Sequence, residues 1–143
     1  MDEKILKILH GKLDEIFVKN DEIRKITSSI DVNTYSLDSQ SLWLGILIGR
    51  LYNSFYYQHR RVLDRNPTND EFRKIRDSVV DYQISYSLDS QSLWLGILIG
   101  RLYNSFYYQH RRVLDRNPTN DEFLEFVDLI KSNQKNFQEK LGF

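Results

Sequence analysis

The sequence predicts an all-α fold, a bundle of about five helices with an internal pseudo-twofold symmetry. One observation behind this prediction is an exact repeat of 38 residues, found at positions 35–72 and again at 86–123. Another is the scarcity of helix breakers, because the 143 residues include only two prolines and six glycines. A third is composition, since hydrophobic residues make up 41% of the chain and can build a core. We expect one helical domain over residues 1–143.

The first predicted helix covers residues 3–30. Isoleucine and leucine recur there from Ile5 to Ile30 in steps of three, four or seven, which is the spacing of one helical face. The polar pair Asn20 and Asp21 marks a point at which this helix could break.

Each copy of the repeat begins with a long amphipathic helix. Ser36, Asp38 and Ser39 can each cap its start and Asn66-Pro67 stops it, which predicts a helix over residues 38–65. Apolar residues follow three- and four-residue steps along it and form a stripe that is expected to face the core. The stripe consists of Leu37, Leu44, Ile48, Leu51, Phe55 and Val62, and in the second copy of Leu88, Leu95, Ile99, Leu102, Phe106 and Val113.

A shorter helix follows each long one. Thr68 and Glu71 have the spacing of a capping box, which predicts that the next helix opens there and covers residues 68–84. Because the connections are short, we expect each long helix to pair with the helix that follows it. The same signals predict the remaining helices at 89–116 and 119–140, with residues 73–85 joining the two copies.

Four glycines within the long helices are candidate sites of close helix packing. They are Gly45 and Gly49 in the first copy, and Gly96 and Gly100 in the second. A glycine inside a helix costs about 1 kcal/mol relative to alanine, so a compensating contact is expected. Close approach of another helix backbone supplies one. Dimerisation in a membrane is the competing interpretation, but the charge of Arg50 argues against it.

The identity of all 38 positions, including those on the helix surface, needs an explanation. Most surface substitutions cost little, so natural duplicates drift apart there. We therefore favour an engineered tandem fusion, with a recent natural duplication as the open alternative. Deleting one copy and the connector leaves residues 1–72 joined to 124–143, that is 72 residues followed by 20 in a parent of 92.

Symmetry gives such a fusion a physical reason. Most soluble homo-oligomers are twofold dimers, and joining two copies of the interface helix places the dimer on one chain. The sequence therefore resembles a single-chain fusion of a helical homodimer. We expect self-association through the long helices within the chain, and leave open both association between chains and a separate protein partner.

The most polar cluster lies at the predicted end of each long helix. Arginines beside tyrosines suit phosphate contacts and stacking on unpaired bases, so a small helical nucleic-acid-binding protein is the alternative function. The candidate polyanion contacts are His59, Arg60, Arg61, Arg65, His110, Arg111, Arg112 and Arg116. The simpler interpretation is that cations complement the helix dipole there. We favour it because 20 basic residues are balanced by 20 acidic ones.

We predict no catalytic, cofactor-binding or metal-binding residues. His59 and His110 each lack a second histidine within one helical turn, and no cysteine, HExxH, GxGxxG or Walker-type motif occurs. The longest strongly apolar run, Leu42 to Ile48, is far shorter than the roughly 20 residues that span a bilayer. We therefore expect a non-catalytic structural or interaction module in the cytoplasm, without a membrane segment.

Overall fold

The computed structural model describes residues 2–18 and 21–140, without the side chains of residues 13, 15–18 and 82. Every regular element in these residues is a helix, which confirms the predicted all-α class. The six helices are α1 (Glu3–Val18), α2 (Asp21–Ser29), α3 (Ser39–Leu63), α4 (Asn69–Ser85), α5 (Ser90–Leu114) and α6 (Asn120–Lys140).

The first predicted helix is two helices in the structure. α1 ends at Val18 and α2 begins at Asp21, on either side of the predicted break, which itself falls partly outside the described residues. The other four helices begin and end within two residues of their predicted bounds.

Both long helices are capped by the residues that the sequence indicates. The side chains of Asp38 and Asp89 accept hydrogen bonds from the backbone N–H groups of Ser41 and Ser92, both at 2.9 Å. At the other end, the C-caps Asp64 and Asp115 adopt left-handed backbone conformations, with φ of 54° in each. These caps turn the chain away from the helix and towards the proline that follows.

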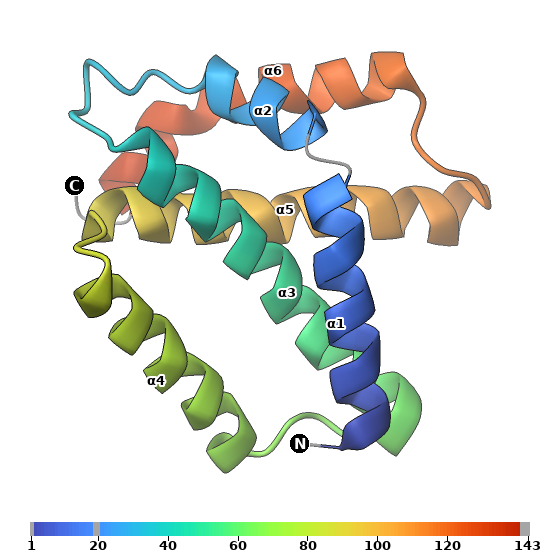
Figure 1. The fold of residues 1–143 in the computed structure, drawn as a ribbon. Helices are drawn as coiled ribbons and strands as arrows, with labels where there is room; N and C mark the ends of the chain where they lie inside the picture. Colours follow the sequence, from blue (N-terminus) through green and yellow to red (C-terminus); the bar gives the residue numbers. More distant parts are fainter. Residues whose placement is uncertain (1, 19–20, 141–143) are drawn as a thin grey trace.

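The long helices α3 and α5 cross in the middle of the molecule and make its most extensive helix–helix contact (Figure 1). α2 and α6 lie side by side over one face of this pair, while α1 packs against α3 (Figure 1). The main core lies between the crossing and the α2–α6 layer. Its buried members are Ile23, Ile26, Ile30, Leu42, Ile46, Leu47, Leu95, Ile99, Tyr103, Phe123, Phe126, Val127 and Ile130.

α4 departs from the expected pairing of each long helix with its successor. α6 packs on α5 as expected, but α4 runs along the opposite edge and none of its described residues is buried (Figure 1). Its recorded contacts with α3 come from its first turn, where the Phe72 ring lies 5.9 Å from that of Tyr52. Sequence explains the difference, because Arg76 of α4 stands where α6 has the buried Val127.

Several residues expected in the core do not lie there. Val113 was predicted to lie on the buried stripe but is 72% exposed, and Leu102 is 36% exposed. The stripe prediction is wrong at these positions because no described helix covers them, whereas Val62 and Leu51 of the first copy are half-buried.

Candidate functional site

The contact between α3 and α5 is built on the four predicted glycines. A Cβ placed on Gly45 would lie 2.8 Å from the Cα of Gly96 and closer still to the carbonyl oxygen of Leu93. A Cβ on Gly49 would lie 3.0 Å from the backbone nitrogen of Arg101, and closer to the carbonyl oxygen of Ile97. The backbones of the two helices therefore touch directly, and no side chain larger than hydrogen fits between them.

Each of these contacts recurs in the opposite direction. A Cβ on Gly96 would meet the Cα of Gly45 at 2.8 Å, and one on Gly100 would lie 3.0 Å from the backbone nitrogen of Arg50. The partners are exchanged and shifted by 51 residues, which is the offset of the sequence repeat. Exchange of partners is what a self-complementary, twofold-related interface requires.

Two buried serines tie the starts of α3 and α5 together. The hydroxyl of Ser92 accepts a hydrogen bond from the backbone N–H of Asp38 at 2.7 Å and donates to the side chain of Asp89. The hydroxyl of Ser41 accepts from the backbone N–H of Asp89 at 2.9 Å and donates to Asp38. The N-cap of each helix is thus bonded to the other helix through a fully buried hydroxyl.

These serine bridges could not be predicted from the sequence. Their only signal is that Ser41 interrupts an otherwise apolar face, and such an interruption does not reveal which group will bond to it.

Side-chain contacts extend the same pattern beyond the glycines. The amide nitrogen of Asn53 donates to the carbonyl oxygen of Arg101 at 3.0 Å, and that of Asn104 donates to the carbonyl oxygen of Arg50 at 3.2 Å. The guanidinium groups lie over tyrosine rings of the other helix, Arg50 at 4.5 Å from the Tyr103 centroid and Arg101 at 4.9 Å from that of Tyr52. Arginine over an aromatic face is an attractive contact that also holds the two helices in register.

A small polar cluster lies where α2 meets α5. The Tyr107 hydroxyl donates to a Glu22 carboxylate oxygen at 2.6 Å. Burial, together with the hydrogen bond to Glu22, raises the pKa of Tyr107 to about 12. The second Glu22 oxygen and the Nε of Arg50 are buried without a recorded hydrogen-bond partner. Because Tyr107 stays protonated at neutral pH, this cluster works as a structural bond between α2 and α5.

The predicted histidine and arginine clusters are also built alike in the two copies. The Nδ1 of His59 lies 2.7 Å from the carbonyl oxygen of Phe55, and its Nε2 lies 3.1 Å from a Glu71 carboxylate oxygen. His110 makes the same contacts with Phe106 and Glu122, at the same distances. Each histidine thus joins the end of a long helix to the start of the helix that follows it.

The glutamates at the centre of these clusters are strongly stabilised in their ionised form. Arg65 donates to Glu71 at 2.9 Å, and the backbone N–H of Thr68 donates to the same carboxylate at 2.9 Å, completing the predicted capping box. These bonds, with Arg65 first among the causes, lower the pKa of Glu71 to about 2. Arg116 and Thr119 hold the pKa of Glu122 well below its ordinary value in the same way.

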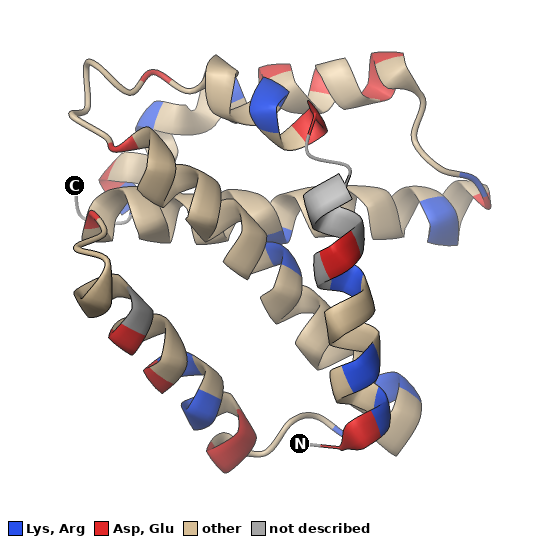
Figure 2. Cartoon of the chain, in the orientation of Figure 1, with Lys and Arg blue, Asp and Glu red and all other residues tan. Residues whose placement is uncertain are grey.

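Four of the six arginines proposed as polyanion contacts are bonded within the chain. Arg60 and Arg111 donate to the side chains of Asn66 and Asn117 at 2.6 and 2.7 Å, while Arg65 and Arg116 bond to the glutamates. Arg61 and Arg112 are exposed, with no hydrogen bond or ion pair recorded to other described residues. In the view of Figure 2, Asp and Glu lie among the Lys and Arg of α1, α2, α4 and α6, whereas the arginines of α3 and α5 are spread from the middle to the end of each helix.

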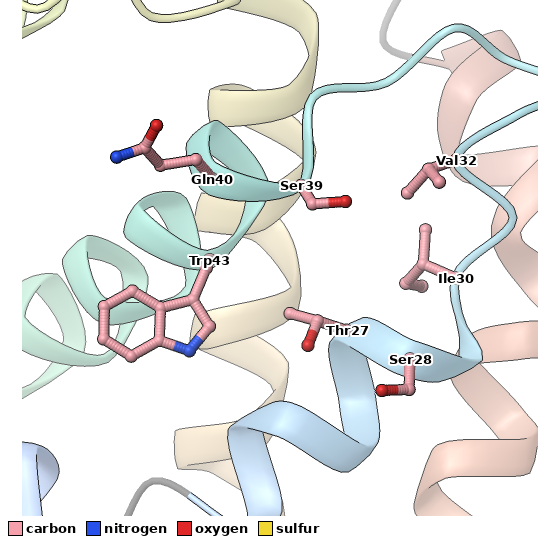
Figure 3. A pocket seen from close by; sticks show the side chains of 7 residues that line it. All are labelled: Thr27, Ser28, Ile30, Val32, Ser39, Gln40 and Trp43. Atoms are coloured by element: carbon pink, nitrogen blue, oxygen red, sulfur yellow. The ribbon is translucent and has the colours of Figure 1, made fainter.

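A shallow depression on the described surface offers little chemistry. It has a volume of about 520 Å³ and opens widely to solvent between the end of α2 and the start of α3. Its lining consists of Thr27, Ser28, Ile30, Val32, Ser39, Gln40 and Trp43, with the Gln40 side chain pointing away from it (Figure 3). None of these residues is an acid or a base at neutral pH, so the depression lacks the groups that proton transfer needs.

Comparisons with known proteins add no assignment. The chain matches no protein-family model, no curated protein and no solved structure. Among the described side chains, no group of three His, Asp or Glu residues is placed to hold a metal ion. Of the helices described, none has the length and apolar character that a membrane crossing requires. The reciprocal surface between α3 and α5 is therefore the best-defined candidate site of the molecule.

Proposed function

We propose that this chain is a non-catalytic, self-associating helical module, a single-chain form of a helical homodimer. The observation that carries the proposal is the set of exchanged contacts between α3 and α5. Each contact of the glycines and of Arg50 with the other helix recurs with its two partners replaced by their counterparts 51 positions away. Two protomers that each contributed one such helix would make these contacts across a twofold axis.

α4 supports an origin by tandem fusion, engineered rather than natural. Its first residues, Asn69–Phe72, repeat Asn120–Phe123 at the start of α6. The segment 69–75 (NDEFRKI) also resembles 20–26 (NDEIRKI), which precedes the first long helix. α4 thus replaces both the last helix of one protomer and the helix that enters the next. A connector with this double role explains why it packs less closely than α6.

The solution mass of the 92-residue parent, residues 1–72 joined to 124–143, tests the proposal. We expect light scattering over a dilution series to show that the parent is a dimer and the present chain is a monomer. Gly45→Ala in the parent should shift the equilibrium towards monomer, because the substitution occurs at both sides of the contact. A parent that stays monomeric at every concentration contradicts the homodimer origin.

Nucleic acid remains the alternative partner that the duplicated arginines predict. Its test is a titration with single-stranded DNA at low salt and again at about 200 mM salt, since phosphate contacts weaken steeply with salt. We expect no saturable binding, because most of the candidate arginines are bonded within the chain. Tight binding that is lost at the higher salt and by Arg61→Ala with Arg112→Ala contradicts this expectation. The cytoplasmic location stays a prediction.

A further inference from the structure

The two copies of the repeat differ in burial along one face of their long helices. In α3 the six residues of this face are buried or half-buried. In α5 each of their six counterparts is more exposed. The fractional exposure rises from 0% at His59 to 19% at His110, and Val113 reaches 72% where Val62 is half-buried. We name the residues Leu102, Ser105, Phe106, Gln109, His110 and Val113 the α5 outer face; their counterparts in α3 are Leu51, Ser54, Phe55, Gln58, His59 and Val62.

The change is not uniform along α5: Leu95, Ile99 and Tyr103, which belong to the main core, are more buried than their counterparts in α3. Tyr57 and Tyr108 lie on another side of the same helices, with their rings 5.6 Å apart, and are 44% and 43% exposed. A general loosening of α5 would have raised the exposure of Tyr108 as well. Spacings of three and four residues place the six outer-face positions on one side of a helix. One missing neighbour on this side therefore accounts for the greater exposure of the six outer-face positions.

That neighbour is α1, which packs against α3 and is present only once in the chain. α1 runs in roughly the opposite direction to α3, with its first turns beside the last turns of α3 (Figure 1). Its Ile5 is fully buried, although it lies only two residues from the start of the helix. The second copy of the repeat is preceded by α4 instead, which has no α1-like helix before it.

The α5 outer face already has the conformation that α1 contacts in α3. The rings of Phe106 and His110 lie 4.6 Å apart at 67°, against 4.5 Å and 66° for Phe55 and His59. Both histidines also keep the same two hydrogen-bond contacts. A helix that docks on α5 would find its surface already formed, so little ordering of side chains would oppose binding.

We propose that the α5 outer face is a docking surface for an amphipathic helix with the sequence of α1, supplied as a separate segment. The proposal deepens the interaction role proposed above by naming a face and the helix that fits it. The sequence of the face is identical to one that α1 covers in this same chain, which identifies the occupant. A whole second chain is a poorer occupant, because its own α1 already covers its own α3.

The direct test is a titration of the full chain against a fluorescently labelled peptide of residues 2–18, followed by anisotropy. A helix this short is marginal alone in water, so the peptide should also carry Gly11→Ala. A Cβ on Gly11 meets nothing within 4 Å, and the gain in helix propensity should tighten binding about fivefold. We expect saturable binding with one peptide per chain.

Matched variants locate the binding. Val113→Asp should weaken it by about tenfold or more, because it places a charge at an apolar position of the α5 outer face. Ile84→Asp is the control, since it removes a 73% exposed apolar side chain from the end of α4, before the start of α5. Ile5→Asp in the peptide should also abolish binding, whereas Leu6→Asp, at a 44% exposed position of α1, should not.

Two results would overturn the proposal: no saturable binding of the Gly11→Ala peptide, or binding that Val113→Asp leaves unchanged. The second would mean that the peptide displaces α1 from α3 or binds elsewhere. Neither result depends on the mass of the 92-residue parent, so failure here and failure of the homodimer origin remain distinguishable. A chain that self-associates through the face without added peptide, and does so less after Val113→Asp, would make a second copy the occupant and also contradict the proposal.

Discussion

The C-terminal halves of α3 and α5 have the same sequence and different surroundings. Phe55 is 1% exposed in α3, the long helix against which α1 packs, while its counterpart Phe106 is half-buried and stacks on Phe126 of α6. The N-terminal halves differ less at the crossing, where all four glycines and both bridging serines are buried. At the crossing, where the two copies pack against each other, these residues are buried to the same degree in both. Where a copy packs against a segment that the chain contains only once, such as α1, the burial of the two copies differs. Burial is therefore set by the neighbour and not by the residue.

The largest expected effect separates the two phenylalanines. Replacing a buried phenylalanine with alanine costs about 3–5 kcal/mol of unfolding free energy. We expect Phe55→Ala to fall in that range and Phe106→Ala to cost about 1–2 kcal/mol less, because part of the Phe106 ring already contacts water. Urea denaturation of the two variants measures the difference. Equal losses of unfolding free energy would show that α1 does not shield α3 from water in solution.

The glycines should show the opposite pattern, equal effects in the two copies. Gly45→Ala and Gly96→Ala each force a Cβ into the backbone of the facing helix, and overpacking of this kind costs about 1–3 kcal/mol. Gly11→Ala is the control, because the added methyl group meets nothing and should raise stability by up to about 1 kcal/mol. Thermal unfolding followed by circular dichroism reports all three. A harmless Gly96→Ala would mean that the helices do not touch in solution.

The bridging serines should also act as equals, with a smaller effect. Ser41→Ala and Ser92→Ala each remove a buried hydroxyl that bonds to both helices, and the loss should be about 1–2 kcal/mol. Ser39→Ala and Ser90→Ala change exposed hydroxyls two residues away and serve as matched controls. Unequal losses of unfolding free energy at Ser41 and Ser92 would contradict the twofold relation at this end of the crossing.

The smallest expected effect concerns acid stability. Glu71 and Glu122 have pKa values below the ordinary value of 4.5, and that of Glu71 is lowered to about 2 by Arg65, Thr68 and His59. Because the folded pKa is depressed, these groups stabilise the fold above pH 4.5, and the contribution is lost as the pH falls from about 5 to 2. Solvent contact weakens the effect.

Melting temperatures between pH 5 and pH 2 measure this effect. Glu71→Gln and Glu122→Gln should flatten the decline to a similar extent, while Glu125→Gln, at an exposed position of α6, should leave the decline unchanged. A decline that neither of the first two variants alters would show that other carboxylates carry the acid dependence.

Local signals in the sequence were sufficient to predict most of the helices. Caps such as Asp38, the stop at Asn66-Pro67 and the capping box at Thr68 act through neighbouring backbone atoms, so they can be read without knowing the fold. The glycines could also be predicted as packing sites, because a helix tolerates their cost only where something compensates it.

What the sequence did not predict depends on contacts between distant segments. The stripe through Leu102 and Val113 has the same pattern as the stripe through Leu51 and Val62, and nothing in that pattern shows that α1 covers only one of them. The bonds of Ser41 and Asn53 to the other long helix are equally hidden, since a polar residue on an apolar face does not name its partner. Because the two copies have the same sequence, equal burial of their stripes was the natural expectation. The burial is unequal because α1 occurs only once and packs against α3.

The most direct test of unequal burial uses single cysteines, because the chain contains none. Ser54 is 8% exposed and its counterpart Ser105 is exposed, so Ser54→Cys and Ser105→Cys place nearly isosteric thiols in the two environments. Ser39→Cys and Ser90→Cys, both at exposed positions, give the rate expected without protection.

Reaction with a thiol reagent should be slower for Ser54→Cys than for Ser105→Cys by about tenfold or more, with equal rates in the control pair. In a chain that begins after α1, and that circular dichroism shows to be helical, the rate for Ser54→Cys should rise to that for Ser105→Cys. Equal rates in the full chain, or a difference that survives removal of α1, would contradict the assignment of the unequal burial to α1.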